Sequence, residues 1–190
     1  MIIAIKEQDG VVLGYTNADS WNKLALQDYV DEENVAIRFS KNGTAFAFSG
    51  MDGLSDALCY DDEFLNLEIT PRSIVRDVIP YIKAKMKAIN KPLAENGSWG
   101  NALVISDGTH IYDISPKFGF FEADEYVCHG YHRGLIQSVL SSTVGLPAEE
   151  RIVKVAQFSS DTTKENLFPL VIADVKNQKF KYVYEGGKSV

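Results

Sequence analysis

Alternating apolar and polar residues predict three β-hairpins along the chain. Each hairpin is centred on a dipeptide in which Asp or Asn precedes Gly, at residues 9–10, 42–43 and 107–108. Such dipeptides favour tight hairpin turns because both turn positions need a positive φ. Short β-prone runs flank the first turn. The runs beside the other two turns predict strands near residues 35–40, 44–49, 101–106 and 109–114.

Two further stretches in the second half of the chain predict strands. The sequence EYVCHG, at residues 125–130, predicts a single strand. The run LFPLVIADVKNQKFKYVYEG predicts a final strand pair with its turn near Lys176, Asn177 and Gln178. Pro169 lies at the beginning of that pair. Because proline has no N–H to donate, it predicts a strand start or a sheet edge.

The segment between the second and third predicted hairpins has the apolar periodicity of a helix. Thr70 followed by Pro71 predicts an N-cap and a first turn. Apolar residues then recur at helical spacing, at Ile74, Val78, Ile82, Met86 and Ile89. Pro80 lies within this stripe and is expected to kink or break the helix. Other helices are predicted near 51–60, at 133–142, and from Pro147 to a Ser/Thr-rich run at 159–163.

Strands and helices are segregated along the chain. The predicted order is two hairpins, two helices, a block of strands, two helices and a final strand pair. This order favours an α+β fold with mostly antiparallel sheets over a doubly wound parallel sheet. A length of 190 residues with no repeat or linker predicts one domain over residues 1–190.

Composition and charge exclude several classes of protein. The formal net charge is −7 and the basic residues form no cluster, which argues against a nucleic-acid partner. No apolar run approaches the ~18 residues of a membrane span, so no membrane association is expected. The polar run Lys6 to Asp9 interrupts the hydrophobic core that an export signal requires, which predicts a cytoplasmic protein. Nothing in the sequence indicates a cofactor.

The segment Cys128-His129-Gly130-Tyr131-His132 contains three possible metal ligands. No second pair of ligands at matching spacing accompanies it, whereas a zinc site usually needs two spaced pairs. Structural histidines at a strand end are therefore favoured, and no metal site is predicted. Cys59 and Cys128 are expected to be reduced and buried. The acidic run that begins at Asp61 is expected to be a solvated surface.

The succession of these elements, together with several short stretches, resembles the proteasome subunit family and its bacterial relatives in the N-terminal nucleophile (Ntn) hydrolase superfamily. The stretches are IAIKEQDGVVLGYT, NVAIRFSKNGTAFAFSGMDG, VCHGYHRG and LPAEERIVKVAQ. The resemblance implies a four-layer αββα sandwich, in which helices cover the outer faces of two stacked antiparallel sheets. It also implies assembly into rings, so a homo-oligomer is expected.

Active members of that superfamily begin with Thr, Ser or Cys, whose side chain attacks an amide while the free α-amino group takes up the proton. The first residue here is Met1, followed by Ile2, and a thioether has no proton to lose. By the resemblance, Asn34 stands where the family has a lysine, and Tyr131 stands where it has a turn serine. No catalytic residue is therefore predicted.

The resemblance does not decide which residue stands at the position of the family's aspartate. A direct alignment of the second strand puts Thr16 at the family's aspartate, whereas a two-residue insertion would bring Asp19 there instead. Asp161 lies near the place of a later aspartate. The residues expected around the residual cleft are Thr16, Asn17, Asp19, Asn34, Tyr131 and Asp161.

Three functions fit a retained scaffold without its nucleophile. The first is a catalytically silent proteasome-like subunit that acts by assembly or by binding a protein or peptide partner. The second is a peptidase or amidohydrolase that needs processing or uses another cleft residue. The third is a small-ligand binding module.

Overall fold

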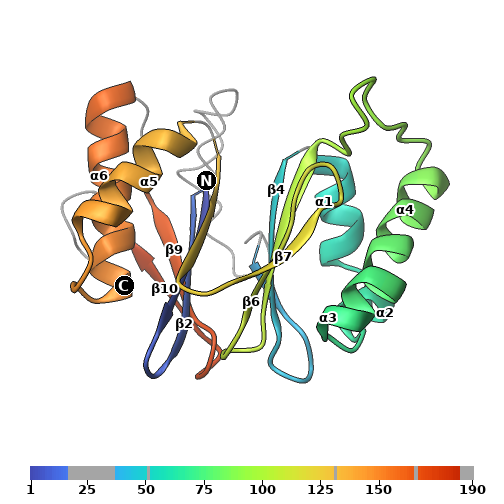
Figure 1. Cartoon of the computed structure of the whole chain (residues 1–190), viewed down its shortest axis with the longest axis horizontal. Helices are drawn as coiled ribbons and strands as arrows, with labels where there is room; N and C mark the ends of the chain where they lie inside the picture. The colour runs from blue at the N-terminus through green and yellow to red at the C-terminus, as the bar shows by residue number, and fades with distance from the viewer. Residues whose placement is uncertain (17–36, 51, 131, 165–166, 185–190) are drawn as a thin grey trace.

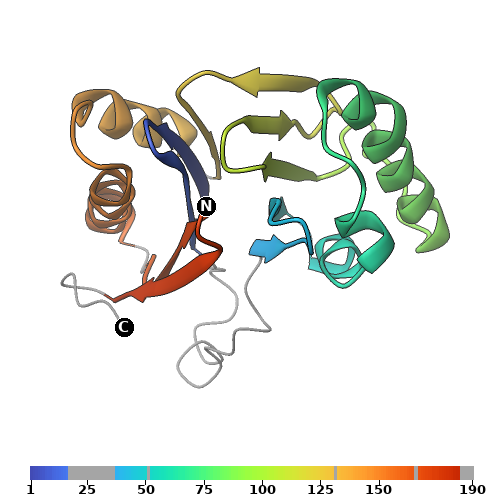
Figure 2. The same ribbon diagram turned by 90° about the horizontal axis from the view of Figure 1, so that it is seen from below.

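Two five-stranded antiparallel sheets stack face to face, and helices cover the outer face of each sheet (Figure 1). The structure is a computed structural model that describes residues 1–16, 37–50, 52–130, 132–164 and 167–184. Figure 2 gives the view from below, in which both sheets lie between the two groups of helices. This arrangement is the four-layer αββα sandwich that the family resemblance implies.

The first sheet joins strands that are far apart in the chain. Its order is β10-β9-β2-β1-β8, and every neighbouring pair is antiparallel. Its strands are β1 (Ile2–Glu7), β2 (Gly10–Thr16), β8 (Tyr126–His129), β9 (Leu170–Asp174) and β10 (Lys179–Val183). The predicted final strand pair is confirmed. The hairpin that opens the sequence thus lies between strands from the last third of the chain.

The second sheet follows the order of the chain, β3-β4-β5-β6-β7. Its strands are β3 (Ile37–Phe39), β4 (Ala45–Gly50), β5 (Asn101–Ser106), β6 (Ile111–Ile114) and β7 (Phe120–Ala123). The second and third predicted hairpins, β3–β4 and β5–β6, are confirmed. β7 is not predicted from the sequence, because its short, largely exposed stretch carries no clear alternation.

Each helical layer packs on its own sheet. The helices over the second sheet are α1 (Asp52–Cys59), α2 (Asp62–Leu65), α3 (Pro71–Ser73), a π-helical turn η2 (Ile74–Val78) and α4 (Ile79–Ala88). Those over the first sheet are α5 (Arg133–Ser142) and α6 (Ala148–Thr163). The Ser/Thr-rich run is the last turn of α6, as predicted, whereas α2 is not predicted. Among the described segments, no helix is both long and apolar enough to cross a bilayer.

The interior strand β1 is buried on both of its faces. Ile2 and Ala4 lie in the apolar layer between the two sheets. Ile3 and Ile5 point the other way and pack under α5 and α6. All four side chains are fully buried. Because side chains alternate along a strand, β1 contributes to two separate apolar layers. A third apolar layer lies between the second sheet and its helices.

Of the kink or break predicted at Pro80, the break does not occur, because the helical stripe from Thr70 onward continues through this residue. Thr70 caps the helix and shares a capping box with Ser73, which confirms the predicted start. α3, η2 and α4 then follow one another without a gap from Pro71 to Ala88. The wider π-helical turn ends just before Pro80. The wider turn leaves room for the ring of Pro80, which has no backbone N–H to donate to the preceding turn.

The acidic run that begins at Asp61 has a structural role and is not only a solvated surface. Asp61 caps α2 by accepting hydrogen bonds from the backbone N–H groups of Glu63 and Phe64. It also accepts from the Tyr81 hydroxyl at 3.0 Å and from the Lys85 ammonium at 2.6 Å. Burial opposes ionisation, but the hydrogen bonds from Lys85, Phe64 and Tyr81 outweigh it, so the pKa of this carboxyl lies below its ordinary value.

β2 comes very close to α6 at Gly14. A Cβ atom at this position would overlap the Cγ2 methyl of Ile152, which is fully buried on α6. Ile152 is packed among other apolar side chains of the same layer and cannot turn away into solvent. The missing side chain at Gly14 therefore allows the helix to sit directly on the strand.

Asp61→Asn is expected to lower the free energy of unfolding at neutral pH by about 1–3 kcal/mol, because Lys85 loses its charged acceptor. The lowered pKa adds a pH signature. The carboxylate's contribution is complete above its pKa in the unfolded chain, about 3.9, and is lost as the pH falls through the lower folded value. Urea unfolding at several pH values should show the two proteins converging in acid. Asp62→Asn is the control, and a pH-independent difference would contradict the assignment.

Gly14→Ala is expected to destabilise the protein by about 1–3 kcal/mol, because the new methyl group overpacks the layer under α6. Gly53→Ala is the matched control. Gly53 lies on α1 with open space around it, so the same substitution should leave stability unchanged or raise it by up to about 1 kcal/mol. Chemical denaturation measures both. Ile152→Ala should make the Gly14 substitution less harmful, and strictly additive losses would contradict the predicted overlap.

Candidate functional site

The residual cleft predicted from the sequence is expected at the end of the first sheet where β1 begins. Met1 lies there between the end of β2 and the end of β8. Its backbone nitrogen donates to the Thr16 carbonyl at 3.0 Å, and the Thr16 N–H donates to the Met1 carbonyl at 3.0 Å. On the other side, a Cβ at Gly130 would lie 3.2 Å from the Met1 Cα. Backbone on both sides therefore fixes the position of Met1.

A buried histidine–aspartate pair lies next to this position and bridges the two sheets. His129, opposite Ile2 in the strand register, belongs to β8 in the first sheet. Asp113 belongs to β6 in the second sheet. The His129 Nε2 and Asp113 Oδ1 atoms are 2.6 Å apart, and the two side chains are 10% and 1% exposed. At this end of the sandwich the sheets are thus joined by a polar contact inside an otherwise apolar layer.

The alternation of side chains along β8 explains this pairing. Val127 lies in the layer between the sheets, and His129, two residues later, faces the same way. Cys128 points to the opposite face, into the layer under α5 and α6. Cys128 and His129 therefore do not converge as the ligands of a common metal ion would. The histidine is structural, as favoured from the sequence, while its partner Asp113 is not identified from the sequence.

Both cysteines are buried, as predicted. Burial raises the pKa of the Cys59 thiol to about 12, although Arg38 opposes the shift. Burial likewise raises the pKa of Cys128 above its ordinary value, with Arg133 opposing it. A thiol must ionise to act as a strong nucleophile. Neither cysteine is therefore prepared to act as a nucleophile.

The predicted cleft residues fall into two groups. Asn17, Asp19, Asn34 and Tyr131 lie outside the described residues. Of the other two, Thr16 is buried beside Met1, whereas Asp161 is exposed on α6. The Asp161 carboxylate accepts a hydrogen bond from Gln157 Nε2 at 3.2 Å on the same helix. The role of these residues in a cleft stays a prediction.

Replacing His129 by Leu is expected to cost about 1–3 kcal/mol of stability, because the Asp113 carboxylate stays buried without its partner. His110→Leu is the control. The His110 Nδ1 atom lies 2.9 Å from Asp107 Oδ2, but these side chains are 40% and 34% exposed, so loss of this contact should cost less than about 1 kcal/mol. Urea unfolding monitored by circular dichroism measures both. Equal losses would contradict the role of the buried pair in joining the sheets.

The sequence matches no protein-family model and no curated protein. Solved structures, in contrast, are clearly similar. BPH from Thiobacillus denitrificans, in complex with epoxomicin, aligns with a TM-score of 0.66 at 13% identity, over 90% of this chain and 95% of that chain. Anbu, the ancestral β-subunit, from Yersinia bercovieri aligns with a TM-score of 0.58 at 14% identity, over 97% of this chain and 87% of that chain.

HslV from Trypanosoma brucei gives a TM-score of 0.56 at 13% identity, over 90% of this chain and 97% of that chain. The likeness therefore covers almost the whole of each protein. At these identities it defines the fold. Two stacked antiparallel sheets between two helical layers give this chain the fold of the proteasome-type subunits of the Ntn hydrolases.

Proposed function

We propose that this protein is a catalytically silent, proteasome-subunit-like component that acts by assembly or by binding a partner. The observation that carries the proposal is the residue at the beginning of β1. In the structure Met1 occupies the position between Thr16 and Gly130, and its thioether cannot give up a proton to become a nucleophile.

The surroundings of Met1 support the same proposal. The chemistry of the active superfamily needs a hydroxyl or thiol, a base and a nearby positive charge acting together. Loss of one member of such a unit removes most of its effect. By the sequence resemblance, Asn34 takes the place of the lysine and has no positive charge. The buried thiols of Cys59 and Cys128 are protonated and offer no substitute.

Assembly is supported by the outer surfaces of the helical layers. Val144 and Phe158 are exposed on the layer formed by α5 and α6. Val75 and Ile89 are exposed on the opposite layer, near α4. Burial of such apolar surface against a second copy of the chain would be favourable, because it removes the side chains from water. We therefore propose a homo-oligomer that associates through its helical faces, and a cytoplasmic location for it.

Two measurements on one sample test this function. Native mass spectrometry of the purified protein should give a closed multimer. Incubation with a set of fluorogenic peptides should give no turnover above the buffer background, because no nucleophile stands at the beginning of β1. Sustained peptide hydrolysis by protein with an intact Met1 would overturn the proposal.

A substitution at position 1 separates the loss of the nucleophile from the loss of its supporting groups. Met1→Thr, with threonine exposed at the N-terminus by removal of a tag, is expected to stay inactive because the positive charge is still missing. Met1→Ala, prepared in the same way, is the matched control. Turnover by the threonine variant alone would show that the remaining machinery is intact and would favour the peptidase alternative.

A further inference from the structure

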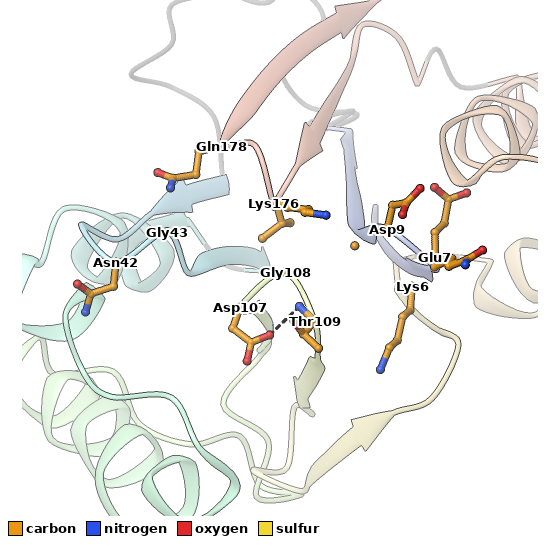
Figure 3. Close-up of a pocket in the computed structure, with 13 residues that line it drawn as sticks. Lys6, Glu7, Asp9, Asn42, Gly43, Asp107, Gly108, Thr109, Lys176 and Gln178 are labelled. Carbon is orange, nitrogen blue, oxygen red and sulfur yellow. Dashed lines mark hydrogen bonds between the residues drawn. The ribbon is translucent and has the colours of Figure 1, made fainter.

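Two pockets of the described structure differ in the charge of their lining. One lies at the end of the sandwich opposite to Met1, between the turns that join β1 to β2, β3 to β4, β5 to β6 and β9 to β10 (Figure 3). Its charged lining consists of three carboxylates and two lysines, namely Glu7, Asp9, Asp107, Lys6 and Lys176. Because both signs of charge are mixed there, it favours neither an anion nor a cation. The other pocket, at the C-terminal end of α4, is lined by lysines and apolar residues without a carboxylate among its described residues.

The pocket at α4, which we call the α4 groove, forms where the chain turns back at the end of the helix. Asn90 has a φ of 53°, in the left-handed region. Its N–H donates to the Lys87 carbonyl at 3.2 Å, and the Lys91 N–H donates to the Met86 carbonyl at 2.9 Å. These two hydrogen bonds form a Schellman motif, which ends a helix and reverses the chain. Residues 91–93 and the last turns of α4 therefore line one groove, with a volume of about 630 Å³.

The α4 groove has apolar residues on both of its sides. Met86, on α4, is 3% exposed and belongs to the apolar layer between the second sheet and its helices. Leu93, on the returning chain, is 47% exposed, and Pro92 beside it is exposed as well. A hydrocarbon group bound in the groove would remove this apolar surface from water, which is favourable. The groove thus offers an apolar contact that the folded chain itself leaves uncovered.

Three lysines, Lys83, Lys87 and Lys91, line the same groove. Lys83 and Lys87 are four residues apart, so they lie on one side of α4. The Lys83 ammonium is 4.7 Å from the centroid of the Phe118 ring, and the Lys91 ammonium donates to Asn101 Oδ1 at 3.1 Å. In the segments that the structure describes, neither Lys83 nor Lys87 forms an ion pair with a carboxylate. The groove is therefore positively charged, although the whole chain has a net charge of −7.

We propose that the α4 groove binds an amphiphilic carboxylate, a molecule with a hydrocarbon chain and one carboxylate group. The hydrocarbon chain contacts Met86 and Leu93, and the carboxylate accepts hydrogen bonds from the ammonium groups of Lys83 and Lys87. Charge-assisted hydrogen bonds of this kind are stronger than those between neutral groups. The proposed ligand thus matches both the apolar surface and the charge of the groove.

The size of the groove favours a small molecule over a protein partner. Its volume lies within the range of small-molecule sites, about 300–1,000 Å³. All of its described lining comes from residues 83–93, whereas each partner in a stable protein interface contributes about 20–30 residues. Ile89, assigned above to contacts between copies, does not line the groove. Met1 lies in the other sheet, so this proposal goes beyond the proposed function and does not depend on it.

Isothermal titration calorimetry at neutral pH tests the proposal with three probes, each below the concentration at which it forms micelles. Decanoate is expected to bind with a dissociation constant of about 1 mM or tighter. Acetate has the carboxylate without the chain, and decyltrimethylammonium has the chain with a positive charge. Each should bind at least about tenfold more weakly than decanoate. Because the whole chain is acidic, non-specific adsorption would favour the cationic probe, so equal or tighter binding of either control probe would overturn the proposal, as would no binding of decanoate.

The variant Lys83→Gln/Lys87→Gln is expected to weaken decanoate binding by about tenfold or more, because two charge-assisted contacts are lost. The matched control is Lys41→Gln/Lys179→Gln, which removes the same charge from exposed positions outside the groove and should bind normally. Equal weakening in both variants would contradict the assigned role of the two lysines.

The apolar contact has its own test. Leu93→Asn should weaken decanoate binding, whereas Val144→Asn, at a side chain that is 66% exposed outside the groove, should not. The methionine methyl signals in nuclear magnetic resonance spectra of the unchanged protein locate the site without any substitution. A decanoate-dependent shift of the Met86 signal supports the proposal. A shift confined to other methionines would overturn it.

Discussion

Burial of β1 on both faces is the constraint on which the rest of the structure depends. A strand that is apolar on both sides needs two covering surfaces, and a single helical layer provides only one. The second sheet covers the face of Ile2 and Ala4, and α5 and α6 cover the face of Ile3 and Ile5. Since the second sheet is also apolar on its outer face, it needs helices of its own, and the four-layer order follows.

The features that the sequence predicts well are local ones. The Asp-Gly and Asn-Gly turns specify three hairpins, and the Thr70-Pro71 pair specifies a helix start, because each signal lies within a few residues of its effect. The sequence does not reveal features that depend on distant partners. From the sequence, Asp61 is expected to be surface charge, because its contact with Lys85 is not visible there. Asp113 has no predicted role, because its partner His129 belongs to the other sheet. Most of the predicted cleft residues, including Asn34 and Tyr131, lie outside the described part of the chain.

The two ends of the sandwich differ in chemical character. At the end where β1 begins, backbone pairing holds Met1 in place, and the polar pair of His129 and Asp113 joins the two sheets. At the other end, four hairpin turns surround an open pocket whose lining includes charged side chains of both signs. The same stacking of sheets thus places a buried polar contact at one end and a pocket at the other.

The composition of the first sheet also bears on the order in which this protein folds. β1 and β2 pair with β8 and β9, so the β1–β2 hairpin gains its neighbours in the sheet only from the last third of the chain. The second sheet, which covers one face of β1, lies earlier in the chain, whereas α5 and α6, which cover the other face, come after β8. Pairings of such wide sequence separation form slowly. Completion of the first sheet is therefore expected to be a late step in folding.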